Sequence, residues 1–388
     1  VAAKAGGTAE PCSPTGLRPR ASLSASPGGT SWGSPRPASG GAVRRRETRG
    51  RCATRLRAAA RSGALRPAAA LEGAQTIWEF TRPHTLLGTL LSVPAVQLFA
   101  ANPLIEKQGL FAVAPKLASC ILLALVPALL INVYITGMNQ IFDVDIDKVN
   151  KPYLPIPAGR LSIAGAWATC LVALGLAAAW ASLSPGARSA PLLLTLAGSA
   201  LLGTAYSAPP VRLKRSPFLA AFCIIVVRGA LVNLGFYAFA KQALGLERAA
   251  GALGLDTPGL VAASFFGVFG LVIALMKDVP DVLGDEMRGV RSLSVRLGPT
   301  RVLRWATALL LSLLGGTSAA FAVGTIVAEA AAVVFRRACL SVAALWALSF
   351  AARSRRDVDA TDPQGVFDFY MDVWRIFYGA YLCLPLVC

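Results

Sequence analysis

The hydrophobic residues of this chain gather into long uncharged runs that short polar stretches separate. Examples are residues 86–104, 117–138, 162–183 and 305–327, none of which contains a charged side chain. An apolar run of about 18 or more residues is long enough to cross a bilayer as an α-helix. The pattern therefore predicts membrane-spanning helices rather than the core of a soluble domain.

The predicted fold is all-α, a polytopic membrane bundle of about nine transmembrane helices. The expected helices cover residues 86–104, 117–138, 162–183, 190–207, 217–240, 259–277, 305–327, 331–352 and 369–387. With nine spans, the loops on one side of the membrane carry 16 Lys and Arg residues and the opposite loops carry 7. This imbalance follows the positive-inside rule, so the basic side is expected to face the cytoplasm or an equivalent compartment.

Residues 1–70 differ in composition from the rest of the chain. They hold 13 Lys and Arg but only two acidic residues, Glu10 and Glu47, and they are rich in Ser, Pro, Ala and Gly. A basic, Ser-rich and acid-poor segment is typical of an organelle transit peptide. The alternative is a disordered basic tail that binds nucleic acid or anionic lipid. We favour a disordered transit peptide at 1–70, followed by a membrane domain at 71–388.

The cysteine and histidine content argues against two classes of metal centre. Eight Cys residues form no Cys-x-x-Cys pair, and His84 is the single His of the chain. A disulfide framework, a zinc site and a multi-His iron centre are therefore not expected.

A first acidic motif follows the second predicted helix. Asn139, Asp143 and Asp147 are spaced four residues apart, which places all three on one face of a helix, with Asp145 pointing away. Like charges on one face at the end of a membrane helix are costly unless a cation lies beside them. Mg²⁺ prefers oxygen ligands and fills its remaining positions with phosphate oxygens and water. We therefore expect these three residues to bind Mg²⁺.

A second acidic motif follows the sixth predicted helix, on the same side of the membrane. Asp281 and Asp285 are again four residues apart, and Asp278 is a possible additional acid. Two facing acidic motifs can hold a Mg²⁺-bound diphosphate between them, with Asp143, Asp147, Asp281 and Asp285 as the catalytic residues. Nearby basic residues are candidates for neutralising the remaining diphosphate charge: Lys148, Lys151, Arg212, Lys214, Arg215 and Lys277.

A single acidic motif of this kind is usually a solvated helix end, and basic loops alone are explained by topology. Two acidic motifs at membrane-helix ends on one side are hard to explain without a site, because buried acids in membrane proteins are rare and functional.

The motifs resemble those of the UbiA-type membrane aromatic prenyltransferase superfamily, and more specifically those of the plastid homogentisate prenyltransferases. The resemblance covers residues 76–388 and rests on 81–85, 139–155 and 277–281 and on the closing pair Phe377 and Tyr378. It implies a bundle of nine helices and an enzyme of a plastid membrane. The implied reaction is Mg²⁺-dependent transfer of a prenyl group from a prenyl diphosphate to homogentisate, with loss of CO₂ and release of diphosphate.

Two stretches divide the resemblance between branches of this group. Residues 206–215 and 227–235 look like the solanesyl-transferring branch, which leads to plastoquinone. Residues 289–295 look like the phytyl-transferring branch, which leads to tocopherol. We favour the solanesyl reaction, with phytyl or geranylgeranyl transfer as the alternative.

Four further residues are candidates for the acceptor site or its cavity. Arg228 lies within a predicted membrane helix, where an unpaired charge is expensive, so it either pairs with a motif carboxylate or holds the carboxylate of the acceptor. Asn132 and Tyr134 precede the first motif by one to two turns, and Arg82 lies in the stretch 81–85.

Two other functions use intramembrane acids. A transporter would place them near the bilayer midplane, often with an inverted repeat, whereas here they cluster on one side and no repeat is visible. A lipid phosphotransferase would have one continuous Asp/Gly/Arg stretch, which the chain lacks. The expected partners are the two small substrates and the bilayer, with no nucleic acid and no obligatory protein partner.

Overall fold

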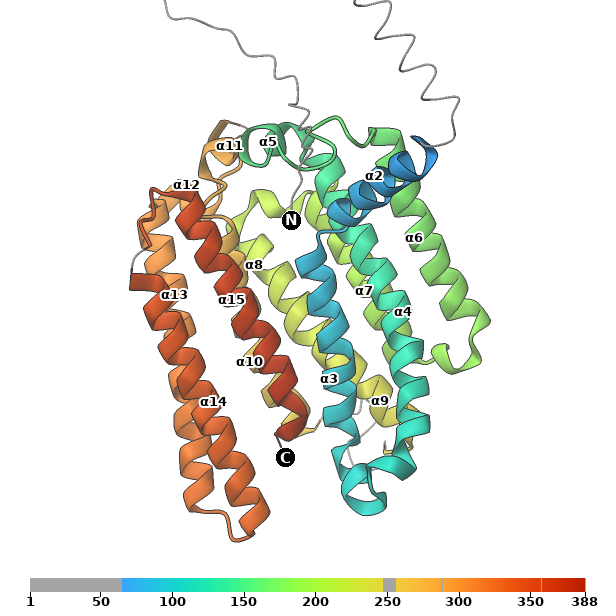
Figure 1. Ribbon diagram of the computed structural model, residues 1–388, viewed down its shortest axis with the longest axis vertical. Coiled ribbons are helices and arrows are strands. Elements are labelled where there is room, and N and C mark those ends of the chain that lie inside the picture. The colour runs from blue at the N-terminus through green and yellow to red at the C-terminus, as the bar shows by residue number, and fades with distance from the viewer. Residues whose placement is uncertain (1–64, 247–255, 288, 357, 388) are drawn as a thin grey trace, which may run out of the picture. The chain divides into compact units, whose positions relative to one another are not determined.

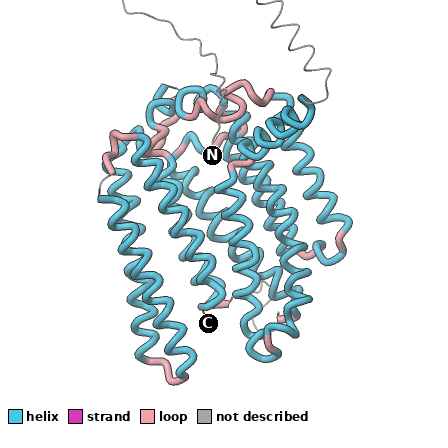
Figure 2. The backbone as a smooth tube through the Cα atoms, in the orientation of Figure 1, coloured by secondary structure: helices cyan, strands magenta, loops and turns pink. Residues whose placement is uncertain are grey.

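The computed structural model describes residues 65–246, 256–287, 289–356 and 358–387, and this part of the chain is helical with no strand (Figure 2). Residues 1–64 of the expected transit peptide lie outside it, so the division of the chain near residue 70 stays a prediction. The helices before the first acidic motif, including the one that carries it, are α2 (Leu65–Phe80), α3 (Pro83–Gln108) and α4 (Leu110–Phe142). Those that follow are α5 (Val144–Asn150), α6 (Ile163–Leu183), α7 (Ala190–Ser207), α8 (Pro217–Ile225), the π-helix η3 (Val226–Gly235), α9 (Phe236–Leu244), α10 (Thr257–Lys277), α11 (Val282–Met287), α12 (Leu293–Leu297), α13 (Pro299–Ile326), α14 (Ala331–Arg356) and α15 (Pro363–Cys383).

Eight of the described helical segments are long and apolar enough to cross a membrane, which confirms the all-α, multi-span fold. One of these spans is built from three consecutive elements, α8, η3 and α9. The last predicted helix forms as α15, but it begins at Pro363 and carries Asp368, Asp372 and Arg375, so it does not count among the eight.

Helix α4 is longer than the apolar run that predicted it. It begins at Leu110 and ends at Phe142, so the polar residues Asn139 and Gln140 continue the helix beyond its apolar part. A single residue, Gly109, separates α3 from α4 with a φ of 82°. Glycine adopts this conformation at no steric cost, so the two helices can fold back on each other with almost no loop.

The core of residues 67–387 is aromatic where α10 meets α15. Phe266 and Tyr381 stack with ring centroids 3.7 Å apart, and Phe377 packs edge-on against both. These three side chains are buried, which explains how α15 remains within the bundle despite its charges.

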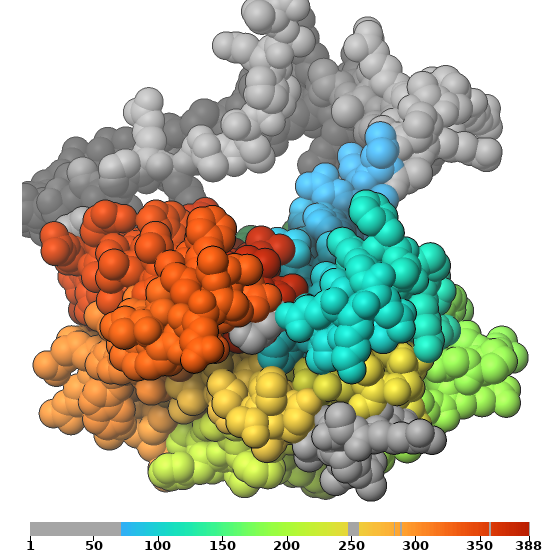
Figure 3. Space-filling model, turned by 90° about the horizontal axis from the view of Figure 1, so that it is seen from below, coloured from blue at the N-terminus to red at the C-terminus, as the bar shows by residue number. Residues whose placement is uncertain are grey.

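Both acidic motifs lie at one end of the bundle. Helix α5 follows α4 and α11 follows α10, and these two short helices lie side by side (Figure 1). Seen from the opposite end of the bundle, the α13–α14 hairpin lies on one side and the α3–α4 hairpin on the other (Figure 3). The fold therefore brings together two segments that are more than 130 residues apart in sequence, Asn150 and Gly284 among them.

Candidate active site

The first acidic motif straddles a break between two helices. Helix α4 ends at Phe142, Asp143 has a φ of −108°, and α5 begins at Val144. The helical hydrogen bonds nevertheless persist, because the amide of Asp143 donates to the carbonyl of Asn139 (3.1 Å) and the amide of Asp147 to that of Asp143 (2.7 Å). The spacing of four residues therefore places these three side chains toward one cavity.

Asp145 lies apart from that cavity, as the helical spacing predicts. Its side chain is 61% exposed and forms an ion pair of 3.3 Å with Lys148. Lys148 is similarly exposed, so this pair belongs to the surface.

The second acidic motif is a turn followed by a short helix, and not the continuous helix that its spacing suggests. Helix α10 ends at Lys277, and Pro280, which has no amide hydrogen to donate, lies within the turn before α11. The amide of Asp285 still donates to the carbonyl of Asp281 (3.1 Å), as in the first motif. Both motifs therefore present acids with the same backbone relationship.

Asn150 joins the two motifs. Its Nδ2 donates to the carbonyl of Asp281 (2.9 Å), and its Oδ1 accepts from the amide of Gly284 (2.9 Å). A Cβ at Gly284 would come closer than 3.0 Å to the Asn150 side chain, so glycine is required for this contact. Lys151 adds an ion pair to the Asp281 carboxylate at 2.5 Å.

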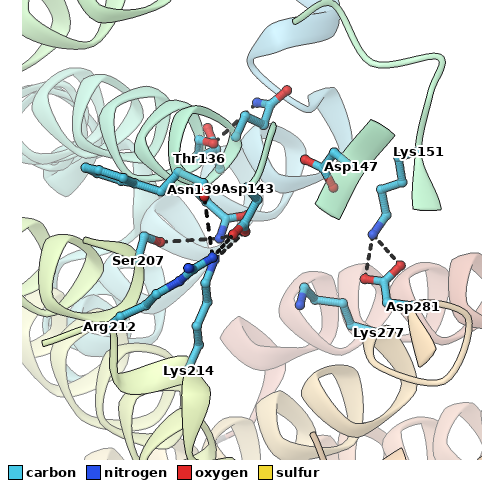
Figure 4. A network of polar contacts seen from close by, with 12 residues as sticks. Thr136, Asn139, Asp143, Asp147, Lys151, Ser207, Arg212, Lys214, Lys277 and Asp281 are labelled. Carbon is cyan, nitrogen blue, oxygen red and sulfur yellow. Dashed lines mark hydrogen bonds and ion pairs between the residues drawn. The ribbon is translucent and has the colours of Figure 1, made fainter. Parts of the chain in front are cut away.

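The two motifs line one polar cavity with an empty volume of about 500 Å³. In Figure 4, Asp143 lies with Arg212 and Lys214 on one side of the site and the Lys151–Asp281 pair lies on the other, with Asp147 and Lys277 between them. We call this space the acidic cavity; its lining residues are Arg82, Asn139, Asp143, Ile146, Asp147, Lys151, Tyr206, Lys214, Lys277, Asp278, Asp281, Asp285, Val290 and Ser292.

Three of the acids that line this cavity are paired with lysines. Lys214 binds the Asp143 carboxylate, Lys151 binds Asp281, and Lys277 binds Asp278 at 3.0 Å. Asp143 also accepts from Arg212 (3.0 Å) and from Asn139 (3.0 Å), and Asn139 in turn contacts Ser207 (3.3 Å). The cavity therefore alternates negative and positive groups along its wall.

Asp147 and Asp285 are less well neutralised than these three. The Oδ2 of Asp147 is buried without a hydrogen-bond partner, and the guanidinium of Arg82 is 3.8 Å away. Burial raises the pKa of Asp147 to about 6, and burial together with the charge of Asp278 raises the pKa of Asp285 to about 7. Both shifts mean that the ionised carboxylates lack compensating positive charge.

The donor set suits a hard divalent cation. Carboxylate, amide and hydroxyl oxygens line the cavity, and no His or Cys is among its lining residues. Among the described residues, no three Asp, Glu, His or Cys side chains are grouped closely enough to hold a metal by themselves. This fits Mg²⁺, which is usually bound through one or two carboxylates and completed by phosphate oxygens and water.

Several predicted residues lie elsewhere. The exposed Arg215 and Lys148 are outside the lining of the acidic cavity. Tyr134 bonds Thr204 on α7 (2.7 Å), and Asn132 bonds Thr89 on α3 (3.0 Å), so both tie α4 to its neighbours. Arg228 lies against the ring of Trp374, and among the described residues no carboxylate is within ion-pair distance of it.

A second, more apolar cavity adjoins the acidic one and was not anticipated. It has an empty volume of about 860 Å³ and shares Arg82, Lys151 and Lys277 with the acidic cavity. Its other lining residues are Glu79, Pro83, His84, Tyr153, Leu154, Pro155, Pro280, Phe367 and Tyr370. Most of this lining belongs to the stretches 81–85, 139–155 and 277–281. Glu79, Phe367 and Tyr370 carry no local pattern, and the last two reach the cavity because α15 packs beside α3.

Comparison with known proteins agrees with this geometry. Residues 98–376 match the model of the UbiA prenyltransferase family. The chain is 40% identical over 314 residues to a homogentisate phytyltransferase from Synechocystis, covering 80% of this chain and 95% of that protein. It is 39% identical over 323 residues to a homogentisate geranylgeranyltransferase from Hordeum vulgare (82% and 73% covered). It is 35% identical over 316 residues to a chloroplastic homogentisate solanesyltransferase from Arabidopsis thaliana (79% and 75% covered).

A solved structure shares the fold. A UbiA homolog from Archaeoglobus fulgidus, described as bound to GPP and Mg²⁺, superposes with a TM-score of 0.51 and 17% identity, covering 80% of this chain and all of that one. The family match and the relatives together settle the assignment. The chain is a prenyltransferase and belongs to the UbiA prenyltransferase family.

Proposed function

We propose that this protein transfers a prenyl group from a prenyl diphosphate to homogentisate in a Mg²⁺-dependent reaction that releases diphosphate and CO₂. The observation that carries the proposal is the acidic cavity, in which two acidic motifs face each other and lysines lie between them. The relatives named as homogentisate prenyltransferases support the acceptor.

Residues of both motifs would hold the metal: Asn139, Asp143, Asp147, Asp281 and Asp285. The Oδ2 of Asp147, which accepts no hydrogen bond and has Arg82 only at 3.8 Å, and the raised pKa of Asp285 support this, because a cation supplies the charge that these carboxylates lack. When bound there, Mg²⁺ takes up negative charge that develops on the leaving diphosphate.

The lysines of the cavity have a second role in this proposal. Lys151, Lys214 and Lys277 neutralise carboxylates in the structure described here. With a metal held on Asp143 and Asp281, Lys214 and Lys151 would be free to face phosphate oxygens, and Arg212 could do the same from beside Asp143. The charge of the cavity then stays balanced as the diphosphate binds.

The reaction balances as an electrophilic substitution with decarboxylation. The allylic C–O bond breaks and its electron pair leaves on the diphosphate. A ring carbon of the acceptor forms the new C–C bond and loses its proton. The carboxylate leaves as CO₂, and a proton replaces it on the side chain. In this scheme the residues that line the cavity bind and orient the diphosphate. The electron-rich ring of the acceptor is the nucleophile, and we assign no residue to its activation.

The prenyl chain length rests on two indications that differ. The residues 206–215 and 227–235 favour a solanesyl donor, which would place the enzyme in plastoquinone biosynthesis. The relatives named for phytyl and geranylgeranyl transfer are 40% and 39% identical, and the relative named for solanesyl transfer is 35% identical. The identities favour a 20-carbon donor, as in tocopherol biosynthesis, and the assay below decides.

We propose a plastid membrane as the location. The eight apolar spans support a multi-pass protein, and the composition of residues 1–70 and the chloroplastic relatives support the plastid.

The test is product identification with purified protein in liposomes. Homogentisate is supplied with phytyl, geranylgeranyl, farnesyl or solanesyl diphosphate in parallel, and the quinol is identified by mass spectrometry. A decarboxylated prenyl quinol with one of these donors is the expected product. Donor turnover that yields no prenylated homogentisate would refute the acceptor, and absence of turnover with all four donors would refute the reaction.

A further inference from the structure

Arg228 places a guanidinium among aromatic rings inside the bundle. It lies in the π-helix η3, within the membrane span that α8, η3 and α9 form together. Its guanidinium carbon is 4.9 Å from the ring centroid of Trp374 and 5.5 Å from that of Phe377, both on α15. π-Helical turns inside longer helices are frequent at functional sites, because they redirect side chains.

In the described part of the chain, this cation has no carboxylate to balance it. Among the described residues no acid lies within ion-pair distance of Arg228, which removes the expectation that it pairs with an acidic motif. Ring faces offset part of the cost of burying a guanidinium, but they leave most of its five N–H donors without an acceptor. A positive charge kept in a membrane span at this cost is usually functional.

A second donor beside Arg228 also lacks an acceptor. Trp374 is 1% exposed, and its Nε1 is buried without a hydrogen-bond partner. A buried indole N–H usually finds an acceptor. The Tyr370 hydroxyl lies close enough to interact with the indole, but no acceptor in the described part of the chain forms a hydrogen bond of normal length with it. Two neighbouring side chains on different helices thus offer N–H groups.

These donors lie directly behind the wall of the second cavity. The ring of Trp374 packs edge-on against His84 (5.5 Å) and Tyr370 (6.3 Å), both of which line that cavity. Tyr378 donates to the carbonyl of His84 (2.7 Å) and so fixes this wall. Arg228 itself keeps part of its surface accessible, so the guanidinium is not sealed in the packing.

The second cavity lies beside the acidic cavity, which is where an acceptor must be held to meet the prenyl group. The second cavity shares Arg82, Lys151 and Lys277 with the acidic cavity, so a ring held there lies next to the diphosphate site. Glu79, the acid that lines the second cavity, is bound by Arg160 at 2.5 Å. The second cavity therefore has aromatic walls and a net positive lining, which suits an aromatic anion.

We propose that Arg228 and the indole N–H of Trp374 form a binding site for the carboxylate of an arylacetate acceptor, reached through the second cavity. The inference rests on the proposed function, since it assigns the part of the enzyme that selects a carboxylated acceptor. It gives Arg228 no part in bond making. In this site, Arg228 of η3 supplies a charged donor to the carboxylate, and Trp374 of α15 supplies a neutral one.

The test compares homogentisate with its uncharged methyl ester in wild type, Arg228→Gln, Arg228→Lys and Trp374→Phe. The ester has no carboxylate to lose as CO₂, so it serves as a competitive inhibitor, and binding is compared as KM for homogentisate against Ki for the ester. We expect wild type to bind the acid about 100-fold more tightly than the ester, because a buried charged partner is worth a factor of this order. In Arg228→Gln the preference falls toward one, through KM for homogentisate and not through KM for the prenyl diphosphate. Arg228→Lys keeps part of the preference for the acid. Trp374→Phe keeps an aromatic ring at this position but removes the indole N–H, so it loses part of that preference.

A merely structural role for Arg228 gives a different result. Arg228→Gln would then lower turnover of homogentisate while the ratio of KM for homogentisate to Ki for the ester keeps its wild-type value, or lose thermal stability while the folded fraction still binds the acid more tightly, and either outcome overturns the proposal. If Arg228→Gln does not fold, the Arg228→Lys and Trp374→Phe ratios decide, and wild-type ratios in both overturn it.

A binding measurement separates this inference from the proposed function. Isothermal titration of the liposome-free purified protein with homogentisate and with its methyl ester needs no turnover. Tighter binding of the acid to wild type than to the Arg228→Gln or Trp374→Phe variant supports the site even if no prenylated homogentisate forms. Equal binding of acid and ester to wild type overturns the site even if the enzyme prenylates homogentisate.

Discussion

The Nζ atom of Lys151 lies 2.5 Å from the carboxylate of Asp281 and thereby links the two acidic motifs across 130 residues of sequence. Lys151 follows α5 directly, and Asp281 precedes α11. The pair also lies where the acidic and second cavities meet, since Lys151 lines both. A single lysine thus borders both proposed substrate sites.

Lys151 and Lys148 form a matched pair for mutation. Lys151→Met is expected to lower kcat/KM by about 100-fold, because it removes a largely buried charged donor from the cavity. Lys148→Met should change it by less than about fivefold, since its partner Asp145 is on the surface. Steady-state kinetics with varied prenyl diphosphate check both. Equal losses in the two variants would mean that the basic loop acts through its overall charge.

A divalent cation is expected to be essential. EDTA should abolish turnover and excess Mg²⁺ should restore it, because the acidic cavity offers oxygen ligands of the type that Mg²⁺ prefers. Mg²⁺ should also raise the thermal unfolding temperature of the protein in the presence of inorganic diphosphate, a readout that does not depend on turnover. A full rate in EDTA would remove the metal from the mechanism.

Asn150 is expected to act as a positioning residue. Asn150→Ala removes two hydrogen bonds from α5 to the second motif, each worth about 1 kcal/mol, and loosens that motif. We expect a higher Mg²⁺ requirement together with a lower rate, measured by titrating Mg²⁺ at saturating substrates. Gly284→Ala should reproduce this effect, because its Cβ displaces the Asn150 side chain. An unchanged Mg²⁺ dependence in both variants would show that the clamp is dispensable.

The sequence was sufficient to predict much of the fold, because a bilayer imposes long uncharged helices that are visible without a structure. It misplaced α15, whose charges at Asp368, Asp372 and Arg375 interrupt the apolar pattern although buried aromatic rings hold the helix in the bundle. The spacing of four between motif acids was also informative. It is kept in the first motif because backbone hydrogen bonds cross the break at Asp143, and in the second because Asp281 and Asp285 both follow Pro280 and are joined by a helical hydrogen bond.

What the sequence could not predict depends on tertiary contacts. The second cavity, the clamp at Asn150 and the aromatic surroundings of Arg228 each combine residues from distant helices. Lys148 and Lys151 look equivalent in sequence, and only the direction of α5 separates the surface lysine from the one in the acidic cavity.

Whether the two acidic motifs form one diphosphate site is decided by a double-mutant cycle on Asp143 and Asp281, with Asp145→Asn as the control. Diphosphate release is measured at saturating Mg²⁺, with the folded fraction of each variant checked in parallel. Asp143→Ala and Asp281→Ala should each lower the rate by at least about 1,000-fold, and the double variant should be little worse, because residues that act as a unit are not additive. Asp145→Asn should retain most of the rate, since its side chain is exposed. A single shared site would be contradicted if the losses from Asp143→Ala and Asp281→Ala multiplied in the double variant. It would also be contradicted by an inactive Asp145→Asn beside an active Asp143→Ala.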